Sequence, residues 1–187
     1  YSAGEGGLER LQTAIRDQLS VSIDRLCKAA KRNRDEIELV SIAGNTVMAH
    51  LFDGLSPVGI GVAPFTPESL FGDHRPAAGL LDGLAPSAQI YMCPALAGYV
   101  GGDITAGLLS SGAWQEDAAC LFIDIGTNGE MGIGDKNGFL CCATAAGPAF
   151  EGAEIECGMG GAPGAINKVK YDNGVISCEV IGDGKAV

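Results

Sequence analysis

The stretch that most constrains this chain is residues 120–130, an apolar run that breaks into a Gly-rich turn. Residues 120–123 are continuously apolar and partly β-branched, which predicts a buried strand. In the turn that follows, Gly126 and Gly129 let backbone N–H groups come close to an anion, and the Thr127 hydroxyl adds a donor. The turn is not a P-loop, because that pattern ends in Gly-Lys-Ser/Thr.

Asp124 stands where this strand ends and the turn begins. A carboxylate at such a position can hold Mg²⁺ through water or orient an attacking water molecule. The alternative is a tight β-turn that an Asp happens to precede, as in many α/β proteins. The stretch alone leaves both interpretations open.

Composition narrows the class of protein. The 187 residues are enough for one large domain or two small ones. A net charge of −11 makes nucleic acid and anionic membranes poor partners. The uncharged residues 83–102 contain Pro86 and Pro94, so we expect a buried strand and loops there, not a membrane span.

Cysteine usage indicates a cytoplasmic protein without iron of its own. The seven cysteines include no CxxC pair and no His/Cys cluster with metal-ligand spacing. Most lie in apolar runs, which predicts buried free thiols in a reducing compartment.

The first half of the chain reads as helices and strands in alternation. We expect a long amphipathic helix at residues 5–31, a strand at 37–43 and a short helix at 47–52 that Asn45 caps. His50 should pack within that helix. Residues 54–86 are rich in Pro and Gly and predict a structured connection, with His74 in a solvated loop. A strand at 89–93 and a helix at 104–109 follow, with Asp103 as the helix N-cap.

The second half reads as a meander of strands. Strands are expected at 120–125, 131–133 and 139–143, with a hairpin turn at 135–138. A second Gly-rich turn, residues 146–152, should open a short helix through residue 157. A further hairpin pairs 168–171 with 175–180. Antiparallel strands followed by a helix do not follow a Rossmann order. They predict an α/β fold of ribonuclease-H-like half-domains, with mixed sheets flanked by helices.

Two such half-domains, residues 1–114 and 115–187, resemble the acetate and sugar kinase, heat-shock chaperone and actin (ASKHA) superfamily of actin-like ATPases. There a DxG turn starts each half, and ATP binds between the halves. Residues 124–129 look like the second phosphate turn, and residues 101–107 look like the connecting helix with its acidic residue, Asp103.

Within this superfamily, four motifs in one order are similar to those of the reductive activators of corrinoid proteins. They are AGNTVMAHL at 43–51, VGGDITA at 100–106, DIGTNGE at 124–130 and AGPAFEGA at 146–153 with CGM at 157–159. The resemblance covers residues 8–187. It implies an enzyme that uses ATP to reduce Co(II) corrinoid to Co(I) on a methyl-transferring partner. That partner is a corrinoid iron-sulfur protein or the corrinoid subunit of a methyltransferase.

The resemblance also implies site residues and cofactors. Asp124 would hold Mg²⁺ or the water, Asp103 would be the opposite carboxylate, and Gly126, Thr127, Asn128 and Gly129 would offer amides to the phosphates of ATP. Gly147, Glu151 and Gly152 would approach the ribose or phosphate side of the nucleotide. The family's 2Fe-2S cluster would lie in an N-terminal part, before Tyr1. The family's first phosphate turn would also lie before Tyr1, and its Gly-rich adenosine turn just after Val187. With one phosphate turn of its own, this chain would bind ATP weakly or not at all and be inactive alone. Whether the protein forms a homodimer is left open by the sequence.

Two other functions stay open at this point. A small-molecule kinase of the same superfamily would transfer phosphate to a substrate hydroxyl, and a cluster-binding domain upstream would argue against it. A non-catalytic scaffold would only dock the corrinoid protein, and ATP turnover by the full-length protein would separate it from an enzyme.

Overall fold

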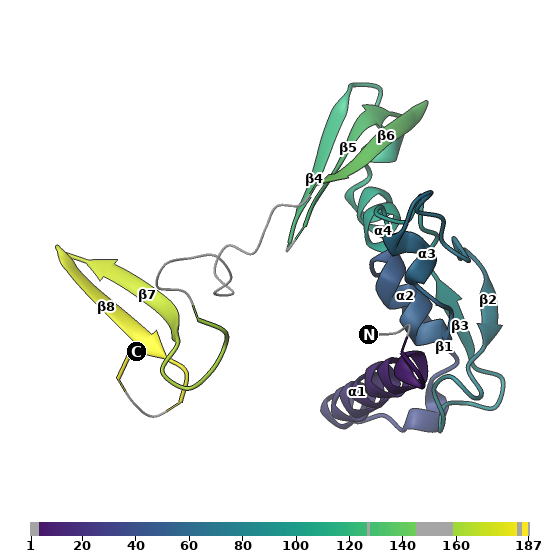
Figure 1. Ribbon diagram of the computed structural model, residues 1–187, viewed down its shortest axis with the longest axis horizontal. Coiled ribbons are helices and arrows are strands. Elements are labelled where there is room, and N and C mark those ends of the chain that lie inside the picture. The colour runs from purple at the N-terminus through teal and green to yellow at the C-terminus, as the bar shows by residue number, and fades with distance from the viewer. Residues whose placement is uncertain (1–3, 127, 145–158, 183–184, 187) are drawn as a thin grey trace. The chain divides into compact units, whose positions relative to one another are not determined.

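The computed structural model describes residues 4–126, 128–144, 159–182 and 185–186. Its helices and strands run along the chain as Figure 1 labels them: α1 (Gly7–Ala30), η1 (Arg34–Glu36), β1 (Leu39–Ile42), α2 (Thr46–Asp53), α3 (Val58–Gly61), β2 (His74–Pro76), β3 (Gln89–Met92), α4 (Gly102–Ser111), η2 (Ala113–Gln115), β4 (Cys120–Ile125), β5 (Gly129–Asp135), β6 (Gly138–Thr144), β7 (Ile166–Asp172) and β8 (Val175–Val180). They form two compact units, Tyr1–Asp124 with Glu130–Ala143, and Ile125–Gly129 with Thr144–Val187.

The first sheet of the larger unit has the strand order β1-β3-β2. β1 runs parallel to β3 and β2 runs antiparallel to it, with His74 opposite Tyr91. β2 lies in the segment that the sequence predicts as a connection. The predicted loop at His74 is therefore wrong, because the residue lies in a strand, whereas the predicted exposure of its side chain is confirmed. Its ring lies 4.8 Å from the ring of Tyr91, because pairing with β3 draws this Pro-containing segment into the sheet edge.

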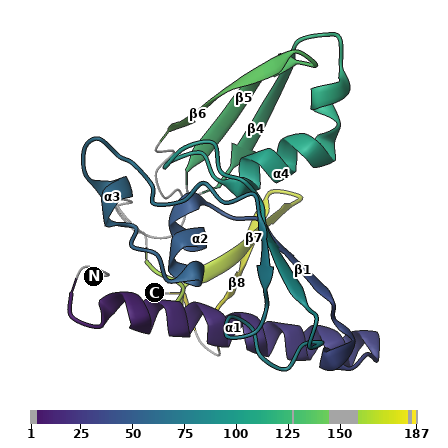
Figure 2. The ribbon, with the colours of Figure 1, turned by 90° about the vertical axis from the view of Figure 1, so that its right-hand side faces the viewer.

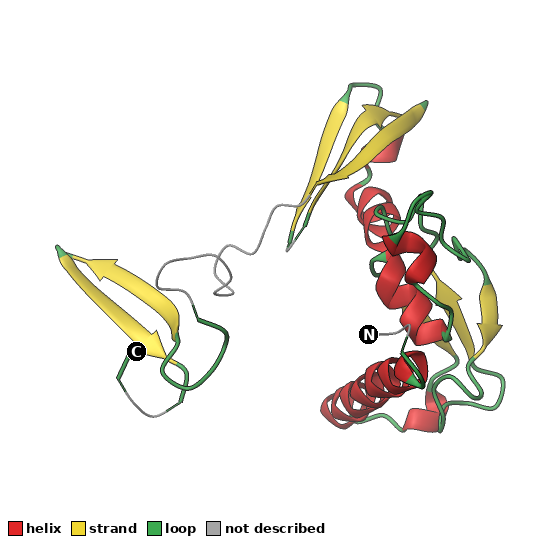
Figure 3. Ribbon diagram, in the orientation of Figure 1, coloured by secondary structure: helices red, strands yellow, loops and turns green. Residues whose placement is uncertain are grey.

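Helices α1 and α2 pack on the same side of this sheet, as Figures 1 and 3 show. Phe52 of α2 is buried against Ile90 and Met92 of β3. The apolar side of α1, with Ile15, Leu19 and Ile23, closes this core at the three- and four-residue steps of the predicted helix. The helix prediction is confirmed for α1.

Helix α2 is held by its cap and by a buried histidine. The Asn45 side chain accepts a 2.8 Å hydrogen bond from the Met48 amide, so its predicted capping role is confirmed. His50 is fully buried, with Nδ1 2.7 Å from the Thr46 carbonyl oxygen. Its Nε2 accepts hydrogen bonds from the amides of Glu68 and Ser69, at 3.1 and 3.3 Å. His50 therefore packs within its helix, as predicted, and also ties the following connection to it.

The second sheet of the larger unit, β4-β5-β6, packs against α4. Figure 2 shows α4 running beside these strands. Ile104 and Leu108 of α4 meet Phe122 of β4 and Phe139 of β6. Gly107 makes the close approach feasible, because a Cβ there would lie 2.5 Å from the Phe122 ring.

The smaller unit contains the β7–β8 hairpin, which confirms the predicted pairing. Val169 lies opposite Cys178 and Tyr171 opposite Ile176, so these four side chains share one face of the ribbon. Lys168 and Lys170, on the alternate positions of β7, both form ion pairs with Glu179. The hairpin therefore has one apolar and one charged face, and Val169, Tyr171 and Ile176 are exposed.

The cysteines are less buried than the sequence predicts. The six described cysteines are free, but none is fully buried, and Cys142 and Cys178 are exposed. Burial is wrongly predicted because apolar runs in these strands have one uncovered face.

No described helix is long and apolar enough to cross a membrane. The expected turn and helix at 146–157 lie outside the described residues.

Candidate functional site

Asp124 lies on the side of β4 that faces α4. Residues of β4 alternate, with Cys120, Phe122 and Asp124 half-buried, while the residues between them are exposed. Phe122 packs against α4, so Asp124, two residues on, points to the same side of the sheet. The sequence predicts a carboxylate at the strand end, and the alternation gives it this direction.

Asp103 lies in the first turn of α4, and not at the N-cap as predicted. Gly101 is the N-cap, because this position packs too closely for a side chain. A Cβ on Gly101 would lie 2.6 Å from the Asn45 Cα and 2.7 Å from the Gly44 carbonyl oxygen. The Asp103 carboxylate, half-buried, accepts a 3.0 Å hydrogen bond from the Ile104 amide. A negative charge here is favoured by the helix N-terminus.

A third carboxylate, Glu130 of β5, completes this group and was not predicted from the sequence. A Cβ on Gly132 would meet Cys141 and Leu108, so even-numbered positions of β5 face α4, and Glu130 is one of them. Burial raises the pKa of the Glu130 carboxyl above its ordinary value, and the charges of Asp103 and Asp124 raise it further. The two-residue alternation along β5 was the signal that could have found it.

The three carboxylates, hereafter the acidic cluster, are linked by the action of the Asp103 and Asp124 charges on Glu130, and they have no basic partner among the described ion pairs. Those pairs lie elsewhere and join Arg32 to Glu36, Arg34 to Asp24, Arg75 to Asp53 and Asp73, Lys136 to Asp117, and Lys168 and Lys170 to Glu179. In the described part of the chain, no three His, Cys, Asp or Glu side chains are placed to hold a metal ion together. Mg²⁺ needs only one or two protein carboxylates, because water fills its other positions. In chemical terms, one carboxylate such as Asp124 is therefore enough to hold a hydrated Mg²⁺.

The turn after Asp124 is described only in part. The Gly126 amide donates a 2.9 Å hydrogen bond to the Asn128 carbonyl oxygen, so this donor is used inside the turn. Asn128 is exposed and Gly129 is buried. Thr127 lies outside the described residues, as do Gly147, Glu151 and Gly152. Of the amide donors that the sequence suggests for phosphate, the described part of this turn therefore shows Gly126 already paired.

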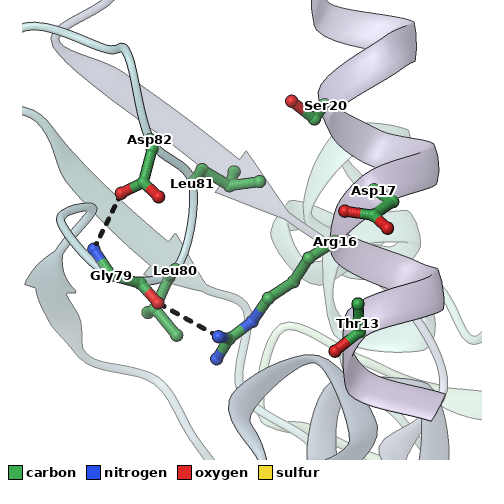
Figure 4. Close-up of a pocket in the computed structure, with 8 residues that line it drawn as sticks. All are labelled: Thr13, Arg16, Asp17, Ser20, Gly79, Leu80, Leu81 and Asp82. Carbon is green, nitrogen blue, oxygen red and sulfur yellow. Dashed lines mark hydrogen bonds between the residues drawn. The ribbon is translucent and has the colours of Figure 1, made fainter. Parts of the chain in front are cut away.

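A separate polar pocket of about 200 Å³ lies between α1 and residues 79–82. Figure 4 shows the Arg16 side chain reaching across it to the Gly79 carbonyl oxygen, a 3.0 Å hydrogen bond. Arg16 also donates to the Phe52 carbonyl oxygen at 3.1 Å, and Asp82 accepts from the Gly79 amide at 3.2 Å. These polar groups are already hydrogen-bonded within the fold. We therefore interpret the pocket as part of the structural contact between α1 and residues 79–82.

Comparison with known proteins gives this geometry a context. Residues 1–116 match the family model described as the RACo middle region, and residues 118–187 match the C-terminal domain of RACo, the ASKHA domain. A solved structure, a reductive activator for a corrinoid iron-sulfur protein, is 40% identical, has a TM-score of 0.77 and covers 94% of this chain and 28% of its own.

Two curated relatives agree with these matches. The corrinoid activation enzyme RamQ of Eubacterium limosum is 39% identical over 96% of this chain and 30% of its own length. A protein of Methanosarcina barkeri described as a reductase of the Co(II) methylated amine-specific corrinoid protein is 29% identical over 72% of this chain and 26% of its own. The chain thus spans about three tenths of the length of these relatives.

The fold defined by these elements and matches is that of an ASKHA protein, so the predicted α/β fold class is confirmed. More narrowly, the chain belongs to the RACo family, and the family predicted from the four sequence motifs is confirmed.

Proposed function

We propose that this chain carries part of the ATP site of a reductive activator that drives the reduction of Co(II) corrinoid to Co(I) on a methyl-transferring corrinoid protein. The names of the relatives support this assignment, since they describe corrinoid activation and reduction of a Co(II) corrinoid protein. The structural support is the acidic cluster, in which the charges of the two carboxylates proposed from sequence both act on Glu130.

In this proposal Asp124 and Asp103 position the bound groups by their charge, and they form no covalent bonds to them. Phosphoryl-transfer sites need positioned charge and little else from the protein. When bound, Mg²⁺ neutralises phosphate charge, and Asp124 is the residue that holds it or its water. Asp103 is the carboxylate on the opposite side, from α4. Glu130 adds a further negative charge that interacts with both, which favours a cation at this position.

The glycine turns supply the remaining contacts to nucleotide. Gly126, Thr127, Asn128 and Gly129 offer backbone and hydroxyl donors to phosphate, and the internal hydrogen bond of Gly126 has to open for that amide to take part. Gly147, Glu151 and Gly152 approach the ribose or phosphate side. In this proposal the two half-domains of the ATPase are residues 1–114 and 115–187. The electron comes from a 2Fe-2S cluster held outside residues 1–187.

The single observation that carries the proposal is Asp124 on the α4 side of β4, with a charge that acts on Glu130. Asp124→Asn keeps the size and one acceptor but removes the charge that a cation needs. We expect the ATP-dependent rate of Co(I) formation by the complete gene product to fall about a hundredfold or more, because the loss of a correctly placed charge at such a site costs on the order of several kcal/mol of barrier.

The matched control is Asp17→Asn, at an exposed carboxylate that lines the pocket of Figure 4. It should leave the rate and the melting temperature unchanged. A near-normal rate for Asp124→Asn with an unchanged melt would remove Asp124 from the site. ATP turnover without any Co(I) formation by the wild type would instead favour a kinase.

A further inference from the structure

Five exposed apolar side chains lie on α3, on the segment that follows it and on the turn at residues 96–100. They are Val58, Val62, Phe65, Leu96 and Tyr99, here named the α3 patch, and each is between 40% and 56% exposed. Figure 2 shows α3 and the loop after it standing out beside α2. The patch is separate from the acidic cluster in sequence and shares none of its residues.

The two segments of the α3 patch are fixed to each other. The rings of Phe65 and Tyr99 lie 6.0 Å apart, and the Tyr99 hydroxyl donates a 2.9 Å hydrogen bond to the Ile60 carbonyl oxygen. A Cβ on Gly98 would lie 3.2 Å from the Phe65 carbonyl oxygen, so the segments approach as closely as glycine allows. The exposed side chains are therefore presented by a pre-organised backbone and not by a loose loop.

The backbone at Phe65 supports a role for this surface. Its φ is +61°, a left-handed conformation that a bulky residue adopts at an energetic cost. Such conformations gather at ligand-binding and recognition sites, where the rest of the fold maintains them. The Phe65 side chain is 48% exposed, whereas phenylalanine side chains are more often buried.

Charge and size select the kind of partner. Residues 55–67 and 83–102 contain no charged residue, in a chain with a net charge of −11. Apolar, aromatic and uncharged surface is typical of the centre of a protein–protein contact. The five side chains expose on the order of 400–500 Å², which is at the scale of a functional patch. A stable dimer buries about 800 Å² on each partner, whereas transient redox encounters use less.

We propose that the α3 patch docks the corrinoid protein during activation. The inference rests on the proposed function, because an activator has to bind an inactive corrinoid protein and release the reduced one in every cycle. A small, rigid, uncharged contact suits such turnover better than a large permanent interface does. The patch therefore sets the affinity for the protein substrate, and the acidic cluster serves ATP.

Two substitutions in the complete gene product test the inference. Val62→Asp places a charge in the patch, and Phe65→Asn removes the ring while keeping a residue type that accepts a positive φ. The concentration of corrinoid protein that gives half the maximal rate of Co(I) formation should rise about tenfold, as for loss of an interface anchor. ATP hydrolysis without corrinoid protein and the melting temperature should not change. Leu26→Ser, at a 68% exposed leucine of α1, is the matched control and should change none of these values.

Other results would overturn the inference in recognisable ways. An unchanged half-saturating concentration in both variants would exclude the patch from docking. A lower melting temperature in both would show that another part of the gene product covers it. A shift in sedimentation toward monomer would make it a contact between two copies. If wild-type protein forms no Co(I), the proposed function itself fails and the docking role fails with it.

Discussion

Glu130 is a residue whose local chemistry works against the stability of the fold. Its carboxyl is partly buried beside Asp103 and Asp124, and its pKa is raised above the ordinary value by burial first and by those two charges next. Glu130 has no basic partner among the described ion pairs, so no ion pair offsets the repulsion by its two neighbouring charges. Such local conflict is common where a protein binds a ligand of opposite charge.

The raised pKa gives a stability prediction with a definite sign. The folded state binds the Glu130 proton more tightly than the unfolded state does, so this contribution to stability is fully present below the ordinary value of 4.5 and is lost as pH rises through the raised pKa. Glu130→Gln should therefore stabilise the protein at pH 7.5, by roughly 0.5 kcal/mol because solvent screens a partly exposed charge. The gain should vanish below pH 4.5. Urea unfolding at both pH values measures it.

The control for this prediction is Glu38→Gln, at an exposed carboxylate outside the acidic cluster. It should show no such difference between the two pH values. If Glu130→Gln lowers the stability at pH 7.5, the carboxylate is satisfied in the fold and the conflict described above does not exist.

At the scale of elements, the contact of α4 with β4 depends on a missing side chain. Gly107 lies inside α4, where alanine normally stabilises a helix by about 0.5–1 kcal/mol. Here a Cβ would lie 2.5 Å from the Phe122 ring, so Gly107→Ala should destabilise the protein by about 1–3 kcal/mol through overpacking. Gly61→Ala in α3 meets no atom within 4 Å and serves as the control in the same urea titration. A neutral or stabilising Gly107→Ala would mean that the helix shifts freely on the sheet.

The elements also show where sequence reasoning stops. Long periodic segments such as α1, and turns with strong local signals such as residues 172–174, follow from the sequence because neighbouring residues determine them. β2 does not, because its pairing partner β3 lies more than ten residues away and Pro76 argues against a strand. The N-cap of α4 moves to Gly101 for a similar reason, since only the packing against Asn45 requires glycine there.

The candidate site divides in the same way. Asp124 and Asp103 were predicted from motifs, and the structure adds Glu130, which the strand alternation could have supplied. Which donors the turn after Asp124 offers is a tertiary question, because the Gly126 amide has already found a partner in the turn. The second Gly-rich turn lies outside the described residues, and its assignment stays a prediction.

At the scale of the whole molecule, the two units differ in how many buried apolar side chains their described residues contain. In the larger unit, α1 and α2 cover one sheet and α4 covers the other. Four side chains are almost completely buried there: Phe52, Ile90, Met92 and Ile104. Among described residues of the smaller unit, the regular structure is the β7–β8 hairpin. A two-stranded ribbon is only marginally stable in water, so we expect local opening to concentrate there.

The two-faced β7–β8 ribbon thereby sets where a protease first cuts the folded chain. Lys168 and Lys170 are exposed and their ion pairs with Glu179 lie at the surface, so these pairs contribute little against opening. Brief trypsin treatment should cleave after Lys168 or Lys170 at least about tenfold faster than after Arg25 or Lys28, which sit in the 24-residue α1. Mass spectrometry of the first products would identify fragments ending at these lysines. Early cleavage within α1 would place the weakest part of the molecule in its helical unit.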